Sequence, residues 1–221
     1  SEHFSASPSS AKQWTECTAS IPFIEQLRQE GKIPRHSVSS AYSLEGTEAH
    51  SWGEKVLRKQ ITLEQVPDQF RGPVGIYVKA CEDLLRPNAY RGVELRVPLF
   101  YAPEGRGTID WFVINTDPVE IHVRDLKYGE GVLVKSEFNK QLAIYAWSAI
   151  LNVVDNEGTF EPFPLDTPVT IHAIQPRHHE WVDEPWETTV GELMEFCANE
   201  ITPAAQRILS GSDDVEFVAS P

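Results

Sequence analysis

Cysteine and long apolar runs are scarce in this 221-residue chain. The three cysteines, Cys17, Cys81 and Cys197, are odd in number and far apart, so we do not expect a disulfide framework. No apolar run reaches the roughly 20 residues that cross a bilayer, and we therefore expect no membrane association. The opening run SEHFSASPSS lacks a basic stretch followed by an apolar one, so we expect no secretory signal and a cytoplasmic location.

Positive charge is also scarce, since 19 Lys and Arg face 33 Asp and Glu and leave a net charge of −14. This balance disfavours nucleic-acid binding over the surface as a whole, but its distribution matters more than its sum. The last segment, 178–221, holds ten Asp or Glu and one Arg. The remainder can therefore present a local basic groove to a phosphate backbone. The residues predicted to line it are Lys12, Arg35, Lys55 and Arg58. The alternative is that these are ordinary solvated charges.

The apolar periodicity predicts an α/β chain without internal repeats. Helices are expected at residues 7–17, 43–60, 74–85, 138–151 and 188–209, the last with a break at Pro203. Strands are expected at 92–101, 107–116, 119–128 and 167–176, the first three forming a meander with a turn at 115–118. Pro67, Gly72 and Pro73 are expected to separate the second and third helices.

This order predicts one domain over residues 1–221. It would consist of N-terminal helices (1–88), a catalytic sheet core (89–177) and an acidic C-terminal helix with a loose tail (178–221).

Two acidic residues and a lysine mark the candidate catalytic centre. Asp125 and Lys127 lie two apart at the end of a predicted strand and so share a face, and Asp110 lies on the preceding strand. Carboxylates are preferred ligands of Mg²⁺ and Mn²⁺, and a bound divalent cation can assist phosphodiester hydrolysis. Lys127 would orient water and offset developing negative charge. A D-x-K triplet on its own is more typical of an ion pair at a strand end.

Two neighbouring residues would complete the oxygen ligands of the cation. Leu126 lies between the catalytic acid and lysine and would contribute its backbone carbonyl. Glu94 alternates with the apolar positions Val93, Leu95 and Val97 of the first strand and would join the metal shell beside Asp110. An exposed Glu94 paired with a nearby arginine is the alternative, as is a purely structural, metal-free carboxylate cluster.

Two helices supply further candidates. His50 would be an imidazole ligand that favours Mn²⁺, although a helical histidine is more often a core or capping residue. Gln141 and Tyr145 lie four apart on one helical face and would hydrogen-bond the scissile phosphate or Lys127. Gly107 would allow close backbone approach near Asp110.

In this order, the motifs EGTEAH, GTID, DLK and QLAIY give the run G-T-x-x-H, G-x-x-D, D-x-K and Q-x-x-x-Y. The run resembles the RecB-like branch of the PD-(D/E)XK nucleases, which includes RecB, AddB and CRISPR-associated RecB-like exonucleases, and more closely a phage and prophage RecB-like family. The resemblance implies a mixed sheet of four to five strands flanked by helices. It also implies metal binding by His50, Asp110 and Asp125, catalysis by Lys127, and substrate support by Gln141 and Tyr145.

Many relatives in that branch hold a [4Fe–4S] cluster through four cysteines. Cys17 matches the first ligand, but Cys81 and Cys197 do not form the closely spaced C-terminal trio. We therefore expect no iron–sulfur cluster and a Mg²⁺ or Mn²⁺ cofactor.

The function expected from the resemblance is a metal-dependent deoxyribonuclease, an exonuclease acting on DNA ends in phage recombination or DNA processing in the host cytosol. A non-catalytic DNA mimic or regulatory protein on a nuclease scaffold is the alternative, favoured by the acidic balance. DNA is the expected partner, and a recombination or single-strand annealing protein and a homo-oligomer remain open.

Overall fold

A five-stranded mixed sheet lies at the centre of the computed structural model, which describes residues 6–34 and 41–210. The strands lie in sequence order, β1 (Tyr90–Leu99), β2 (Ala102–Thr116), β3 (Val119–Leu126), β4 (Pro168–Ile174) and β5 (Trp186–Thr189). Only β3 and β4 pair in parallel, and α5 (Lys140–Leu151) makes the crossover between them. The expected meander and mixed sheet are confirmed.

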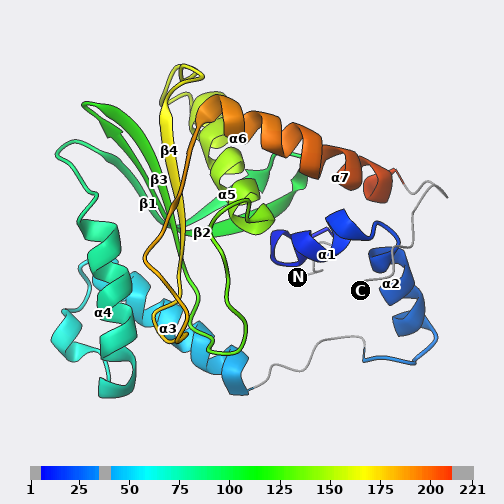
Figure 1. Ribbon diagram of the computed structural model, residues 1–221, viewed down its shortest axis with the longest axis horizontal. Helices are drawn as coiled ribbons and strands as arrows, with labels where there is room; N and C mark the ends of the chain where they lie inside the picture. Colours follow the sequence, from blue (N-terminus) through cyan, green and yellow to red (C-terminus); the bar gives the residue numbers. More distant parts are fainter. Residues whose placement is uncertain (1–5, 35–40, 211–221) are drawn as a thin grey trace.

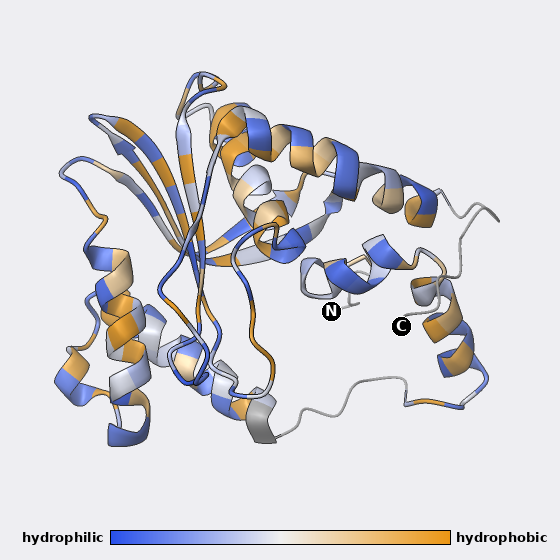
Figure 2. Ribbon diagram, in the orientation of Figure 1, coloured by the Kyte–Doolittle hydropathy of each residue, from blue (hydrophilic) through white to orange (hydrophobic). Residues whose placement is uncertain are grey.

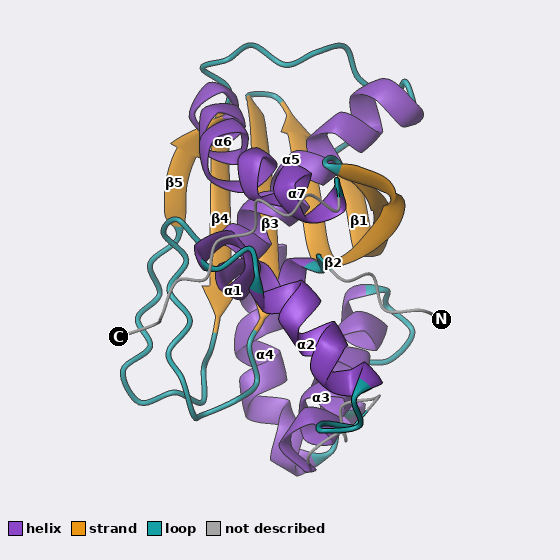
Figure 3. Cartoon of the chain, turned by 90° about the vertical axis from the view of Figure 1, so that its right-hand side faces the viewer, coloured by secondary structure: helices purple, strands orange, loops and turns teal. Residues whose placement is uncertain are grey.

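Helices cover both faces of this sheet (Figures 1 and 3). The remaining helices are α1 (Ala11–Glu16), α2 (Ser20–Gln29), α3 (Ala41–Leu57), α4 (Asp68–Glu82), α6 (Val190–Phe196) and α7 (Thr202–Leu209). One apolar core joins the sheet to α1, α5, α6 and α7, and the other joins it to α3 and α4. Many residues of the strands and of α5 are apolar (Figure 2), and the buried ones belong to these two cores.

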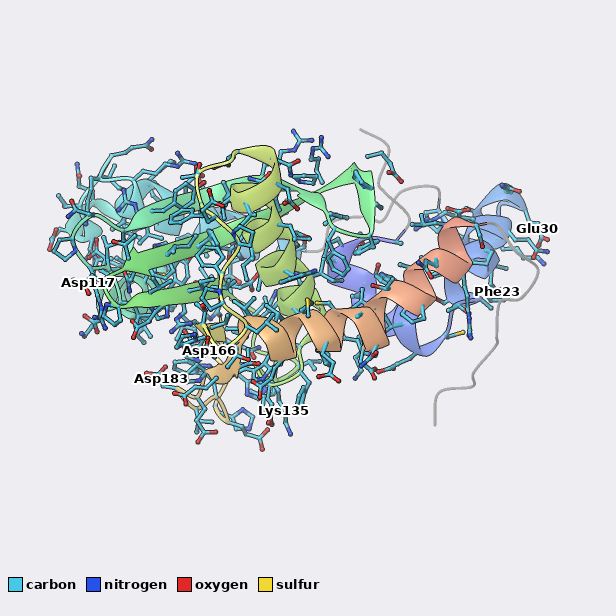
Figure 4. All side chains as sticks on the ribbon, turned by 90° about the horizontal axis from the view of Figure 1, so that it is seen from above. Phe23, Glu30, Asp117, Lys135, Asp166 and Asp183 are labelled. Atoms are coloured by element: carbon cyan, nitrogen blue, oxygen red, sulfur yellow. The ribbon has the colours of Figure 1, made fainter. Side chains whose placement is uncertain are left out.

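Several elements differ from the sequence-based expectation. The short helix α2 and the edge strand β5 were not predicted: α2 buries none of its residues, and β5 has only four, so neither produces a long apolar pattern. Phe23 lies on α2 and Glu30 directly follows it. Both lie at the opposite side of the molecule from Asp117 in the β2–β3 turn (Figure 4). The first strand also ends at Leu99, so Phe100 and Tyr101 form the turn into β2, which begins at Ala102.

The expectation that Pro67, Gly72 and Pro73 separate two helices was wrong in part, since α4 begins at Asp68 and contains both Gly72 and Pro73. Proline inside a helix leaves the carbonyl four residues earlier without its usual donor. Here that carbonyl belongs to Gln69, and the Tyr128 hydroxyl donates to it at 3.3 Å. A tertiary contact that no local pattern reveals therefore helps α4 to tolerate its proline.

The predicted helix 188–209 is divided, as its proline suggested. β5 takes residues 188 and 189, and α6 is followed by a π-helical turn at Cys197–Ile201 before α7. Pro203 lies in the first turn of α7, where its missing N–H is not needed.

Within the described ranges 6–34 and 41–210, no helix combines the length and apolar character needed to span a membrane. Cys81 and Cys197 are buried in opposite cores, and Cys17 is half-buried.

Two buried histidines lie on adjacent strands of the face toward α4. His122 contacts the hydroxyl of Thr170 and the amide of Asn115, and the ring of His172 stacks on Trp181. Burial and the charge of Arg124 lower the pKa of each histidine to about 4, against the opposing charge of Glu120 on His122 and Asp183 on His172. Both imidazoles are therefore neutral in the folded protein above that pH.

We expect stability to fall as the pH drops from 6.5, the ordinary histidine pKa, to about 4. In that window the unfolded chain binds more protons than the folded one, so acid favours unfolding by roughly 1–3 kcal/mol per histidine. Urea denaturation at pH 7 and 4.5 measures this loss. The variant His172→Phe keeps a ring against Trp181 without a titrating group, and it should lose less stability than the wild type over the same interval. An equal loss would contradict the assignment.

Candidate active site

The predicted site residues come from five elements, α3, β1, β2, β3 and α5, with α3 on the other side of the sheet from α5 (Figure 1). His50 lies on α3, Glu94 on β1 and Asp110 on β2. Asp125 and Leu126 end β3, and Lys127 follows them. Gln141 and Tyr145 lie on α5.

Asp110 is the centre of the first group. Its Oδ2 lies 3.1 Å from His50 Nδ1 and accepts a 2.8 Å hydrogen bond from the backbone N–H of Leu126. One ligand atom each from His50, Glu94 and Asp110 lies within 4.8 Å of the other two, and all three residues are half-buried. Nitrogen and carboxylate oxygens at this spacing can surround one divalent cation.

The backbone of Glu94 departs from an ordinary strand. Its φ is +48°, a left-handed conformation that costs non-glycine residues roughly 1–2 kcal/mol. The expected alternation was wrong here, because Val93 packs in the core with α4 whereas Leu95 packs in the core with α5. On β2, Trp111 and Ile109 change faces in the same way. The face that each strand buries therefore changes at Glu94 on β1 and at Asp110 on β2.

The charges in this group are unbalanced. Burial and the negative charge of Asp110 raise the pKa of Glu94 to about 7, despite the opposing effect of His50. Burial lowers the pKa of His50, but its contact with Asp110 and the charges of Asp125 and Glu94 outweigh burial and raise that pKa to about 9. A cluster that attracts protons this strongly is also one that a cation would stabilise.

An ion pair and two hydrogen bonds lead from the second carboxylate toward α5. Asp125 Oδ2 lies 2.8 Å from Lys127 Nζ, which donates to Gln141 Oε1 at 3.0 Å. The Gln141 amide in turn donates to the Tyr145 hydroxyl at 3.3 Å. Gln141 was expected to hydrogen-bond either the scissile phosphate or Lys127, and the structure has the hydrogen bond with Lys127. The ammonium is therefore held at a fixed point beside the carboxylates.

Burial acts in opposite directions on this pair. It raises the pKa of Asp125, as does Asp110, while Lys127 opposes the shift. It lowers the pKa of Lys127, but the attraction of Asp125 exceeds that penalty and the net shift is upward. Lys127 is consequently an ammonium at neutral pH.

Gly107 lets α5 approach β2. A Cβ at this position would lie 3.0 Å from the Tyr145 ring and 3.1 Å from Leu99, closer than side chains ordinarily pack. The absence of a side chain therefore leaves room for Tyr145.

The residues expected to line a DNA groove do not share one element. Lys12 is exposed on α1, whereas Lys55 and Arg58 lie at or just beyond the end of α3. Lys55 lies over the Trp52 ring at 4.3 Å, and Arg58 pairs with Glu54 and donates to the Val93 carbonyl. Arg35 lies outside the described residues. Contact of these residues with DNA stays a prediction.

The family model described as protein of unknown function (DUF2800) matches residues 3–73 and 77–220 of the chain. The chain belongs to the DUF2800 family. That description names no activity, so family membership leaves the chemistry of this DUF2800 protein to be argued from its own residues.

No role was predicted from the sequence for Gln175 and Arg177, which lie just after the end of β4. Gln175 is buried and hydrogen-bonds the loop that follows Lys127, and Arg177 pairs with Glu45 of α3. Polar residues just after an apolar strand are a weak signal, because they are also typical of an ordinary loop.

The left-handed backbone of Glu94 predicts that two small substitutions at this position differ in folding stability. In metal-free protein, Glu94→Gly should be more stable than Glu94→Ala by about 1 kcal/mol, because only glycine adopts this φ without strain. Thermal or urea unfolding in the presence of a chelator measures the difference. Both variants lose the carboxylate, so its removal cancels in the comparison, and a more stable alanine variant would contradict the strained conformation.

Proposed function

We propose that this protein is a divalent-metal-dependent DNA nuclease with a PD-(D/E)XK core of the RecB-like type. The observation that carries the proposal is the convergence of His50, Glu94 and Asp110 with the Asp125–Lys127 pair where β3 ends beside β2. The meander followed by a helical crossover to a parallel strand agrees with such a core.

The donor set fits a hard divalent cation. His50, Glu94, Asp110 and Asp125 would hold it, with the Leu126 carbonyl as a further predicted ligand. A bound Mg²⁺ or Mn²⁺ supplies polarisation of a phosphoryl oxygen and acidification of water. In the present arrangement Leu126 contacts Asp110 through its N–H. That hydrogen bond orients the central carboxylate while the Leu126 side chain stays buried.

The protein side chains divide the remaining work. Lys127 places a positive charge where the attacked phosphodiester would develop negative charge, and it can orient the attacking water. Gln141 holds the ammonium by accepting its hydrogen bond, and Tyr145 holds the Gln141 amide. The two α5 residues thus fix a donor that would otherwise be a flexible lysine.

We expect degradation of linear duplex DNA in the presence of Mn²⁺ and resistance of covalently closed circles, as for an exonuclease acting on ends. Asp125→Ala should lower the rate by at least about 100-fold, because it removes a metal ligand and the partner of Lys127. Gel electrophoresis of end-labelled DNA measures both. Asp117→Ala is the matched control, since this acid is exposed at the β2–β3 turn away from the site (Figure 4).

Equal cleavage by wild type and Asp125→Ala would show that the activity has another origin. Rapid nicking or cutting of closed circles would contradict the exonuclease assignment while leaving phosphodiester hydrolysis in place.

Metal preference provides a separate prediction. His50→Ala should weaken Mn²⁺ binding more than Mg²⁺ binding, because imidazole nitrogen favours the softer ion. Titration calorimetry with each ion measures the two affinities without DNA. Unchanged Mn²⁺ affinity would remove His50 from the ligand set.

A second candidate function is binding of a basic protein partner, and a cavity of about 570 Å³ favours it. The segments 133–137 and 181–187 line this cavity, and their charged residues are Glu137, Asp183, Glu184, Glu187 and Lys135. Lys135 and Asp183 extend at the same side of the molecule (Figure 4). A protein that binds Mn²⁺ but cleaves no DNA of any form would favour this second function.

A further inference from the structure

Arg177 contacts two segments that are distant from it in the sequence, α3 and the loop that begins at Tyr128. Its guanidinium lies 4.4 Å from the centre of the ring of Tyr128, the residue that directly follows Lys127. One nitrogen lies 3.2 Å from the carboxylate of Glu45 on α3, and the other pairs with Glu130 of the loop beyond Tyr128. Planar guanidinium suits this double role of stacking and two-sided pairing better than an ammonium does.

The loop that carries Glu130 is itself fixed by Gln175. The buried amide accepts a hydrogen bond from the Val134 N–H at 2.8 Å and donates to the carbonyls of Gly129 and Val132 at 2.7 and 2.8 Å. Each polar atom of this side chain therefore has a backbone partner across the loop. Tyr128 is held at its other end by the hydrogen bond to Gln69 of α4. Arg177 consequently meets a pre-formed surface.

α3 needs such a connection. Among the described elements it packs mainly against α4 and less extensively against β1, while β3 is packed between β2 and β4. His50 lies on α3 five residues after Glu45, whereas Asp125 and Lys127 lie on and after β3. Arg177 pairs with Glu45 of α3 on one side and with Glu130 of the loop after Lys127 on the other, so it bridges α3 to the segment that carries the lysine.

We propose that Arg177 is a positioning residue that sets His50 of α3 against the carboxylates of the sheet. The role rests on the proposed metal-dependent function. Arg177 touches neither Asp110 nor Asp125 in any described contact, so it acts through α3 and the loop 128–134. Since its side chain is partly exposed, the coupling is modest rather than all-or-none.

The test is a double-mutant cycle on Mn²⁺ affinity, measured by titration calorimetry without DNA. Arg177→Gln should weaken Mn²⁺ binding about 3- to 10-fold, less than the 10- to 100-fold typical of groups that hydrogen-bond a metal ligand directly. In a His50→Ala background the same substitution should change the affinity less than 1.5-fold, because the residue that Arg177 positions is gone. Arg177→Lys should fall between wild type and Arg177→Gln.

Arg86→Gln is the matched control, because it removes the arginine of another partly exposed pair, that with Glu120. It should leave Mn²⁺ affinity unchanged. Should Arg177→Gln fold poorly by circular dichroism, Glu45→Gln breaks the same link from α3 and should give the same cycle.

Mn²⁺ affinity equal to wild type in Arg177→Gln, or an equal loss with and without His50, would overturn the positioning role while the proposed function stands. A wild type that binds no Mn²⁺ would overturn the metal site and the positioning role together.

Discussion

Repulsion between carboxylates where β3 ends beside β2 is the constraint around which this site is organised. Asp110, Asp125 and Glu94 are brought together where burial removes most of the water that would otherwise screen them. The protein offsets this repulsion in part through His50 and Lys127, whose pKa values both rise as a result. The remaining negative charge is what makes the group suited to a divalent cation.

The surrounding structure keeps these acids from moving apart. Leu126 fixes one oxygen of Asp110 through its backbone, the left-handed conformation of Glu94 lies at the change of buried face, and Gln141 holds the lysine. Strain of this kind persists only when neighbouring packing determines the backbone, and here both apolar cores meet at the same strands. Packing in the two apolar cores therefore maintains the strained backbone of Glu94 and the close approach of the carboxylates.

The acidic character of the chain is compatible with a site for a polyanion. Much of the negative charge belongs to the C-terminal segment and to the cavity near β5. The candidate site combines its acids with Lys127, and the charge of Arg58 also acts on Glu94. Electrostatic attraction depends on this local distribution rather than on the net charge. The same separation leaves the acidic cavity available for a role distinct from the candidate site.

The sequence by itself determined the meander, the helix before β4 and the strand positions of Asp110 and Asp125, because residue periodicity is a local property. It did not determine α2 and β5, which are too short for such a pattern, or the continuity of α4 through Pro73, which uses a hydroxyl from Tyr128. Nor did it place Glu94, whose alternation with Val93 and Leu95 predicted an ordinary strand face. Only the tertiary structure brought His50 to Asp110 and Arg177 to Glu45, since contacts between distant segments depend on how helices pack against the sheet.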